Sequence, residues 1–99
     1  MITFIRTDSI APGKLGEALG FAVQIAAFVE KIIGHKVGVS VPVGGNPFRV
    51  AWVVTLPDLA TLESSFKTLQ MNPEYLKQVE AAAPYFLPGA ARDEIWSSL

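Results

Sequence analysis

The first nine residues follow a two-residue period, which is the pattern of a β-strand. One face of this strand carries Ile2, Phe4, Arg6 and Asp8, and the other carries Thr3, Ile5 and Thr7. After a break at Pro12-Gly13, the apolar residues from Lys14 to Ile33 recur in steps of three and four. This spacing predicts one long amphipathic helix, and Gly34 stands where helices commonly end in a left-handed cap.

Two further alternating runs predict a β-hairpin. Valines alternate with small residues over Val37–Val43, and a second alternating run covers Phe48–Leu56. The turn sequence Gly44–Pro47 lies between them, so the two strands are expected to be antiparallel neighbours. Pro42 has no backbone N–H, and the first strand therefore either lies at a sheet edge or ends there.

The second half of the chain predicts a pair of helices and a last strand. Asp58 is the expected N-cap of a helix with apolar residues at Leu59, Leu62, Phe66 and Leu69. Asn72-Pro73 begins a second helix, which Pro84 stops. The expected apolar side of this second helix is Leu76, Val79 and Ala83. Residues 90–99 are expected to form a strand with Arg92, Glu94 and Trp96 on one face and Asp93, Ile95 and Ser97 on the other.

The order strand, helix, strand, strand, helix pair, strand is the split β-α-β arrangement of ferredoxin-like folds. It predicts an α+β domain over residues 1–99, with a βαββαβ order and a four-stranded antiparallel sheet covered by helices on one face. The strands carry apolar residues on both faces, as Phe4 and Ile5 illustrate. The uncovered face therefore needs a partner. We expect a homodimer that closes through this open sheet face into an α/β barrel.

Composition excludes several classes of function. The chain has 99 residues, a net charge of −1 and no basic run, which argues against nucleic-acid binding. There is no cysteine, and His35 is the only histidine, so disulfides, thiolate chemistry and a multi-histidine metal site within one chain are excluded. We expect neither a metal nor a cofactor.

The N-terminus lacks the pattern of a signal peptide, and the longest uncharged apolar stretch, residues 18–29, is too short to span a bilayer. We therefore expect a soluble, cytoplasmic protein with no membrane partner.

Several local sequences resemble the dimeric α/β-barrel superfamily. They are Ala11–Lys14, Gly44–Pro47 followed by Phe48–Trp52, Leu56–Ala60, and Met71–Glu74. Together with the order of elements along the whole chain, they make it similar to NIPSNAP-like proteins and, more distantly, to antibiotic-biosynthesis monooxygenases. The resemblance implies two sheets packed face to face in a dimer, with a pocket between sheet and helices in each subunit. The superfamily includes cofactor-free oxygenases, haem-degrading enzymes, lactone isomerases and non-enzymatic binders, so the fold alone assigns no reaction.

Two of these chemistries are weakened by the residues present. The resemblance implies that oxygenases of this type combine an asparagine with a tryptophan and a histidine or arginine around the pocket. Trp52 is available for this role, whereas Asn46 falls in a turn and Asn72 at a helix cap. Haem-degrading relatives carry a histidine on the later helix, and residues 58–83 contain none.

Arg6 is the strongest candidate for a functional side chain. It lies on the same face of a central strand as Phe4, where a charged group needs an anionic partner. One interpretation is a structural salt bridge, to Asp8 on the same strand or to Asp93 or Glu94 on the last strand. The other is a clamp for a ligand carboxylate.

Two other residues have both a structural and a functional interpretation. Trp52 either packs in the core or forms a pocket wall. His35 follows the helix end, where an imidazole is commonly exposed or caps the last carbonyls, and it is a weak candidate for a general base. Arg6 is the other weak catalytic candidate.

Together the candidates predict a small, mainly apolar pocket that binds a small apolar or aromatic molecule. The expected ligand-binding residues are Phe4, Arg6, His35, Trp52, Phe66 and Tyr75. Cofactor-independent oxygenase or isomerase chemistry is one outcome. The alternative is a filled core in a binding or assembly module without catalysis.

Overall fold

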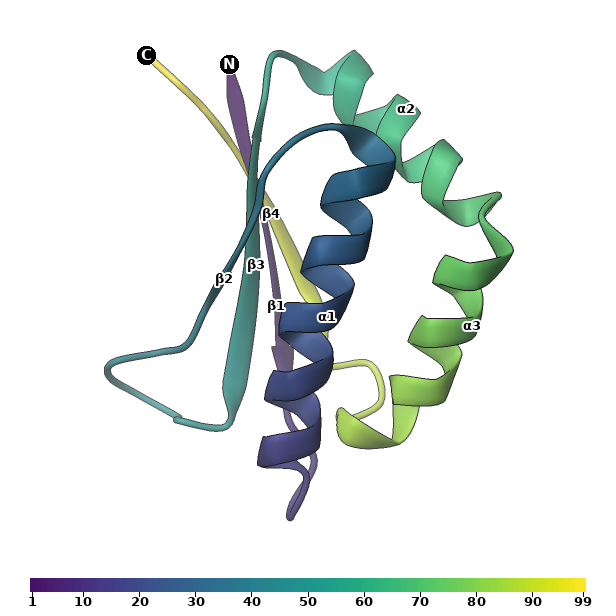
Figure 1. The fold of residues 1–99 in the computed structure, drawn as a ribbon. Helices are drawn as coiled ribbons and strands as arrows, with labels where there is room; N and C mark the ends of the chain where they lie inside the picture. Colours follow the sequence, from purple (N-terminus) through teal and green to yellow (C-terminus); the bar gives the residue numbers. More distant parts are fainter.

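Three helices lie on one face of a four-stranded antiparallel sheet in the computed structural model, which describes residues 1–99 (Figure 1). The strands, in the sheet order β2-β3-β1-β4, are β1 (Ile2–Ser9), β2 (Val37–Ser40), β3 (Arg49–Leu56) and β4 (Arg92–Ser97). The helices are α1 (Leu15–Ile33), α2 (Leu59–Gln70) and α3 (Pro73–Ala82), followed by the 3₁₀ turn η1 (Ala83–Tyr85). The predicted α+β, ferredoxin-like βαββαβ order and the four-stranded antiparallel sheet are confirmed.

Local signals in the sequence fix the ends of the helices. Helix α1 ends at Gly34, which has a φ of 74° and donates its backbone N–H to the carbonyl of Glu30. Helix α2 begins at Asp58, whose Oδ1 accepts hydrogen bonds from the backbone N–H and the hydroxyl of Thr61. These two bonds hold the pKa of Asp58 below its ordinary value. The side chain of Asn72 caps α3 in the same way.

Helix α3 turns only part of the predicted apolar side inward. Val79 and Ala83 face the space between the sheet and the helices, beside Tyr75 and the buried Ala82. Leu76 does not line this space and is 47% exposed. The helix packs mainly against α1, α2 and η1. The predicted apolar side is therefore right for Val79 and Ala83 and wrong for Leu76.

Strand β2 is shorter than predicted. It pairs with β3 from Val37 opposite Val54 to Ser40 opposite Ala51, and the predicted continuation to Val43 leaves the sheet. Pro42 cannot donate to the ladder, which accounts for the early end. Both interpretations of this proline hold, because β2 also lies at the sheet edge.

The pairing register divides the side chains of the sheet between two faces. The helix-covered face contains two buried clusters: Ile2, Phe4, Val54, Leu56 and Leu62 in one, and Ile10, Ala18, Ala22 and Val50 in the other. Figure 1 shows no element over the opposite face. Ile5 lies opposite Val53 on this open face, and Trp96 there is 60% exposed. None of the helices has the length and apolarity needed to cross a membrane.

Candidate functional site

A cavity of about 410 Å³ lies between the sheet and the helices. Its wall comes from β1, β2, β3, all three helices, η1 and the segment that connects η1 to β4. Most of the residues that line it are apolar, and Arg6, Asp8 and Ser65 are the polar exceptions apart from the hydroxyl of Tyr75. A space of this size and composition is typical of sites for small organic ligands. The core of this protein is therefore not filled solid.

Aromatic rings form much of the cavity wall. Phe4 from β1 and Phe66 from α2 meet edge to face, with ring centroids 5.2 Å apart. Phe86 lies 6.1 Å from Trp52 and 6.0 Å from Phe21, centroid to centroid. Phe21 of α1 thus packs against Phe86 in the segment after η1. The rings present a surface suited to flat, apolar molecules.

Trp52 is both a packing residue and a wall of the cavity. Its indole Nε1 donates a hydrogen bond to the backbone carbonyl of Ala22 in α1 at 3.1 Å. Its ring packs beside the buried cluster that includes Ala22 and Val50, and it also lines the cavity. The hydrogen bond satisfies the polar group of a half-buried ring and fixes its orientation.

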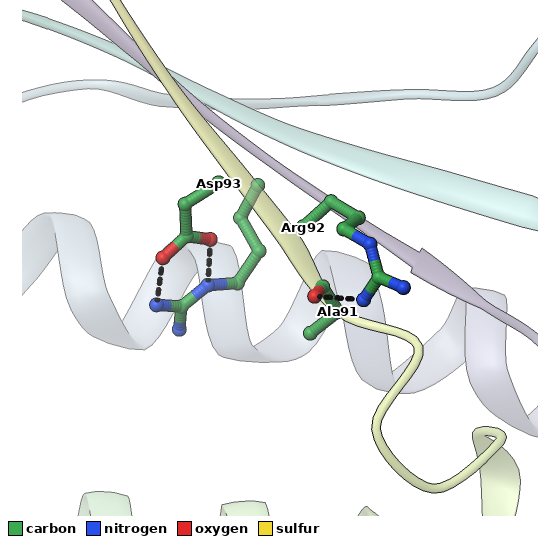
Figure 2. Close-up of polar contacts among 4 residues, drawn as sticks. Ala91, Arg92 and Asp93 are labelled. Atoms are coloured by element: carbon green, nitrogen blue, oxygen red, sulfur yellow. Dashed lines mark hydrogen bonds and ion pairs between the residues drawn. The ribbon is translucent and has the colours of Figure 1, made fainter.

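Arg6 forms a bidentate ion pair with Asp93. Its Nε donates to Oδ1 at 2.7 Å and its Nη2 to Oδ2 at 2.9 Å, and Figure 2 shows both oxygens of Asp93 facing the guanidinium group. The register of β1 and β4 places the two residues directly opposite each other, which explains the choice of Asp93 over Asp8 or Glu94. Asp93 raises the pKa of Arg6. The structural salt bridge is thus present, while Arg6 also lines the cavity.

The position of the Arg6 guanidinium is fixed by aromatic rings as well. Its central carbon lies 5.6 Å from the ring centroid of Phe4 and 5.8 Å from that of Phe66, within range of a cation–π interaction. The third nitrogen, Nη1, forms no hydrogen bond with the protein, so its two N–H groups are free to bind a ligand oxygen.

Asp8 lines the cavity, although the sequence pattern indicated it only as a partner for Arg6. It is the one carboxylate that lines the cavity. Its Oδ1 accepts a hydrogen bond from the backbone N–H of Ser9 at 2.8 Å, and its Oδ2 forms none. The connecting segment covers this end of β1, because Leu87 donates its N–H to the carbonyl of Ser9 and Phe86 pairs with Ile10. The resulting burial raises the pKa of Asp8. Its position on the same strand face as Phe4 and Arg6 was the available sequence signal.

The structure brings together five of the six expected ligand-binding residues. They are Phe4, Arg6, Trp52, Phe66 and Tyr75, and all of them line the cavity. His35 does not line it, and lies between the end of α1 and the start of β2. The role of these residues in binding remains a prediction. Asn46 and Asn72 also lie outside the cavity wall, where their side chains accept bonds from the backbone N–H groups of Phe48 and Tyr75.

Solved structures share this fold. An uncharacterised NIPSNAP domain protein from Burkholderia xenovorans matches with a TM-score of 0.85 at 16% identity, over 100% of this chain and 95% of that chain. An antibiotic biosynthesis monooxygenase matches with a TM-score of 0.74 at 13% identity, over 100% and 99%. SnoaB, a cofactor-independent oxygenase from Streptomyces nogalater, matches with a TM-score of 0.71 at 12% identity, over 98% and 91%.

No protein-family model and no curated protein matches the sequence. The structural matches confirm the resemblance of this fold to NIPSNAP and antibiotic-biosynthesis-monooxygenase structures. At identities this low they establish the fold and not the chemistry.

Proposed function

We propose that the protein binds a small apolar or aromatic molecule in the cavity between its sheet and its helices. The observation that carries this proposal is the cavity itself, which measures about 410 Å³ and has a mainly apolar wall. A few polar groups, Arg6 and Asp8 among them, stand in that wall and are able to orient a ligand. The fixed positions of Trp52 and Arg6 favour a site that exists before the ligand arrives.

For this site we propose a reaction that needs no cofactor, either oxygenation or isomerisation. SnoaB has this fold and is described as a cofactor-independent oxygenase, which supports the class by analogy of fold alone. Neither asparagine of this chain lines the cavity, and this departure from the expected oxygenase pattern favours isomerisation. A binder without catalysis is the alternative, and it shares the same cavity.

Binding is tested with 2-naphthol, a small aromatic probe, in an NMR titration that follows the indole N–H signals. The chain has two tryptophans, and the Trp52→Phe variant assigns their signals. Trp52 lines the cavity, whereas Trp96 on the open sheet face serves as the internal control. We expect a saturable shift of the Trp52 signal and none of the Trp96 signal. Equal or unsaturable shifts of both would overturn the proposal. Native mass spectrometry of freshly purified protein then searches for a retained natural ligand.

We also propose that the chain forms a homodimer through its open sheet face. Ile5 and Val53 give this face an apolar centre, and all three helices lie on the other side of the sheet (Figure 1). A sheet that is apolar on both faces needs cover on both. A second copy of the chain has the same face and supplies that cover symmetrically.

Sedimentation velocity tests the dimer. We expect a mass of twice 10.7 kDa at micromolar concentration, and a monomer for Ile5→Arg. Val23→Arg is the matched control, because Val23 is 63% exposed on α1 and away from the open face. A wild-type monomer, or equal effects of the two substitutions, would contradict the proposed interface.

A further inference from the structure

We propose that Asp8 and Arg6 together form a proton-transfer site, in which Asp8 removes a proton from a carbon next to a ligand carbonyl whose oxygen binds Arg6 Nη1. This inference rests on the proposed binding function of the cavity. It narrows the ligand to apolar or aromatic ketones with an acidic C–H group. It also assigns the residues that act on them.

The two side chains are placed for this task by the strand that carries them. They are two residues apart on the same face of β1, so their Cα atoms are about 7 Å apart. Both side chains line the same cavity. In a ketone, the carbonyl oxygen and the hydrogen on the neighbouring carbon point in different directions. Arg6 as the donor and Asp8 as the base occupy adjacent positions on one strand face, so each can reach one of these two atoms.

Arg6 is suited to bind a neutral carbonyl rather than a carboxylate. Asp93 already holds two of its nitrogens and compensates its charge, and Asp8 adds a second negative charge nearby. Arg6, Asp93 and Asp8 together carry a net charge of −1 when ionised, so the site would repel a ligand carboxylate. The free Nη1 still offers two N–H donors in a position fixed by Asp93, Phe4 and Phe66. Donors fixed in advance stabilise the negative charge that develops on a carbonyl oxygen during proton removal.

Asp8 has the features of a base that acts on a bound molecule. One oxygen is held by the backbone of Ser9, and the other forms no hydrogen bond within the protein. The mainly apolar wall removes water that would otherwise solvate the carboxylate. This loss of solvation raises the pKa of Asp8, which strengthens it as a proton acceptor.

The step needs no oxidant or reductant. The carboxylate of Asp8 takes the proton, the electron pair of the broken C–H bond forms a C=C bond, and the carbonyl π electrons move to the oxygen. The resulting enolate oxygen is held by Arg6. In a ketone that carries a C=C bond next to the acidic carbon, this enolate is a dienolate, and Asp8 returns its proton to the far end of it. The C=C bond shifts into conjugation with the carbonyl, and the net reaction is isomerisation by proton transfer. In a ketone without that C=C bond the proton returns to the same carbon, and the net result is exchange with solvent.

The test uses 2-tetralone, an aromatic ketone with acidic hydrogens beside its carbonyl, dissolved in D₂O. Replacement of these hydrogens by deuterium is followed by NMR, with the rate in buffer alone subtracted. We expect exchange catalysed by the wild type. It should fall about 10²–10⁴-fold in Asp8→Asn, which removes the base, and about 10²–10³-fold in Arg6→Gln, which removes the oxyanion donor. Asparagine at position 8 still accepts the Ser9 N–H, so this variant is expected to fold.

Glu80→Gln is the matched control, because Glu80 is an exposed carboxylate outside the cavity wall and its loss should leave exchange unchanged. Binding of 2-tetralone is monitored separately through the Trp52 indole signal. Binding without catalysed exchange, or exchange that persists in Asp8→Asn, would overturn the proton-transfer site and leave the binding function intact. Absence of any binding to the wild type would overturn both.

Discussion

Replacing Trp52 with alanine measures how far its ring belongs to the core. A fully enclosed aromatic ring buries about 150–250 Å², and Trp52, which keeps only a minor part of its surface exposed, buries roughly three quarters of that. At about 25 cal/mol per Å², the lost apolar area corresponds to about 3–5 kcal/mol. The hydrogen bond from Nε1 to the carbonyl of Ala22 adds about 1 kcal/mol. We therefore expect the free energy of unfolding to fall by about 4–6 kcal/mol, at the top of the usual range for such truncations.

The substitution Trp52→Phe separates the two contributions. Phenylalanine keeps most of the ring and loses the hydrogen bond, so we expect a loss of about 1 kcal/mol. For a chain of 99 residues the unfolding entropy is about 0.2 kcal/mol per degree. The melting temperature should then fall by about 20–30 °C for alanine and about 5 °C for phenylalanine.

Calorimetric and circular-dichroism melts at one fixed protein concentration provide the measurement, since association would otherwise shift the midpoint. A loss below about 1 kcal/mol for Trp52→Ala would show that the ring does not pack against α1. Equal losses for the two variants would show that the hydrogen bond, and not the ring, carries the contribution.

Three further predictions follow from individual contacts. Asn72→Ala removes the cap of α3 and should lower the free energy of unfolding by about 1 kcal/mol in urea titrations, whereas an unchanged midpoint would contradict the capping role. Arg6→Ala removes a half-exposed ion pair and should lower the melting temperature by less than about 5 °C while abolishing 2-naphthol binding. A large loss of stability with binding retained would show that Arg6 is a structural residue and not a ligand-binding one. The raised pKa of Asp8 means that its carboxylate destabilises the fold increasingly as pH rises above the ordinary value of 3.8. Asp8→Asn should therefore be more stable than the wild type at about pH 7 and lose this advantage at about pH 3, and a less stable variant at neutral pH would contradict the burial argument.

Local patterns in the sequence were sufficient to predict the order and type of the elements. Caps at Gly34, Asp58 and Asn72 depend on residues close in sequence, and the structure places all three as expected. The hairpin and the two faces of each strand depend only on the period of the side chains. The inward face of α3 was predicted only in part, with Leu76 wrongly included, because it depends on how the helix packs against distant neighbours such as α1.

The candidate site was only partly predictable for a related reason. Strand parity grouped Phe4 with Arg6 on one face of the first strand but left open which face meets the helices, and the structure turns this face, with Trp52, toward them. The partner of Arg6 depended on the register between β1 and β4, which left three carboxylates as alternatives until the pairing with Asp93 was known. A cavity forms where the side chains between the sheet and the helices leave space unfilled, and no local sequence pattern encodes this. Asp8 was overlooked as a cavity residue because its burial comes from the distant segment around Leu87.

Both the proposed binding function and the proposed proton-transfer site require the cavity. Crystallography under xenon pressure tests its existence most directly, because xenon enters empty apolar cavities. We expect xenon atoms between the sheet and the helices, in contact with the rings of Trp52, Phe66 and Phe86, which line the space of about 410 Å³. A structure in which these side chains close the space and no xenon binds there would contradict the account.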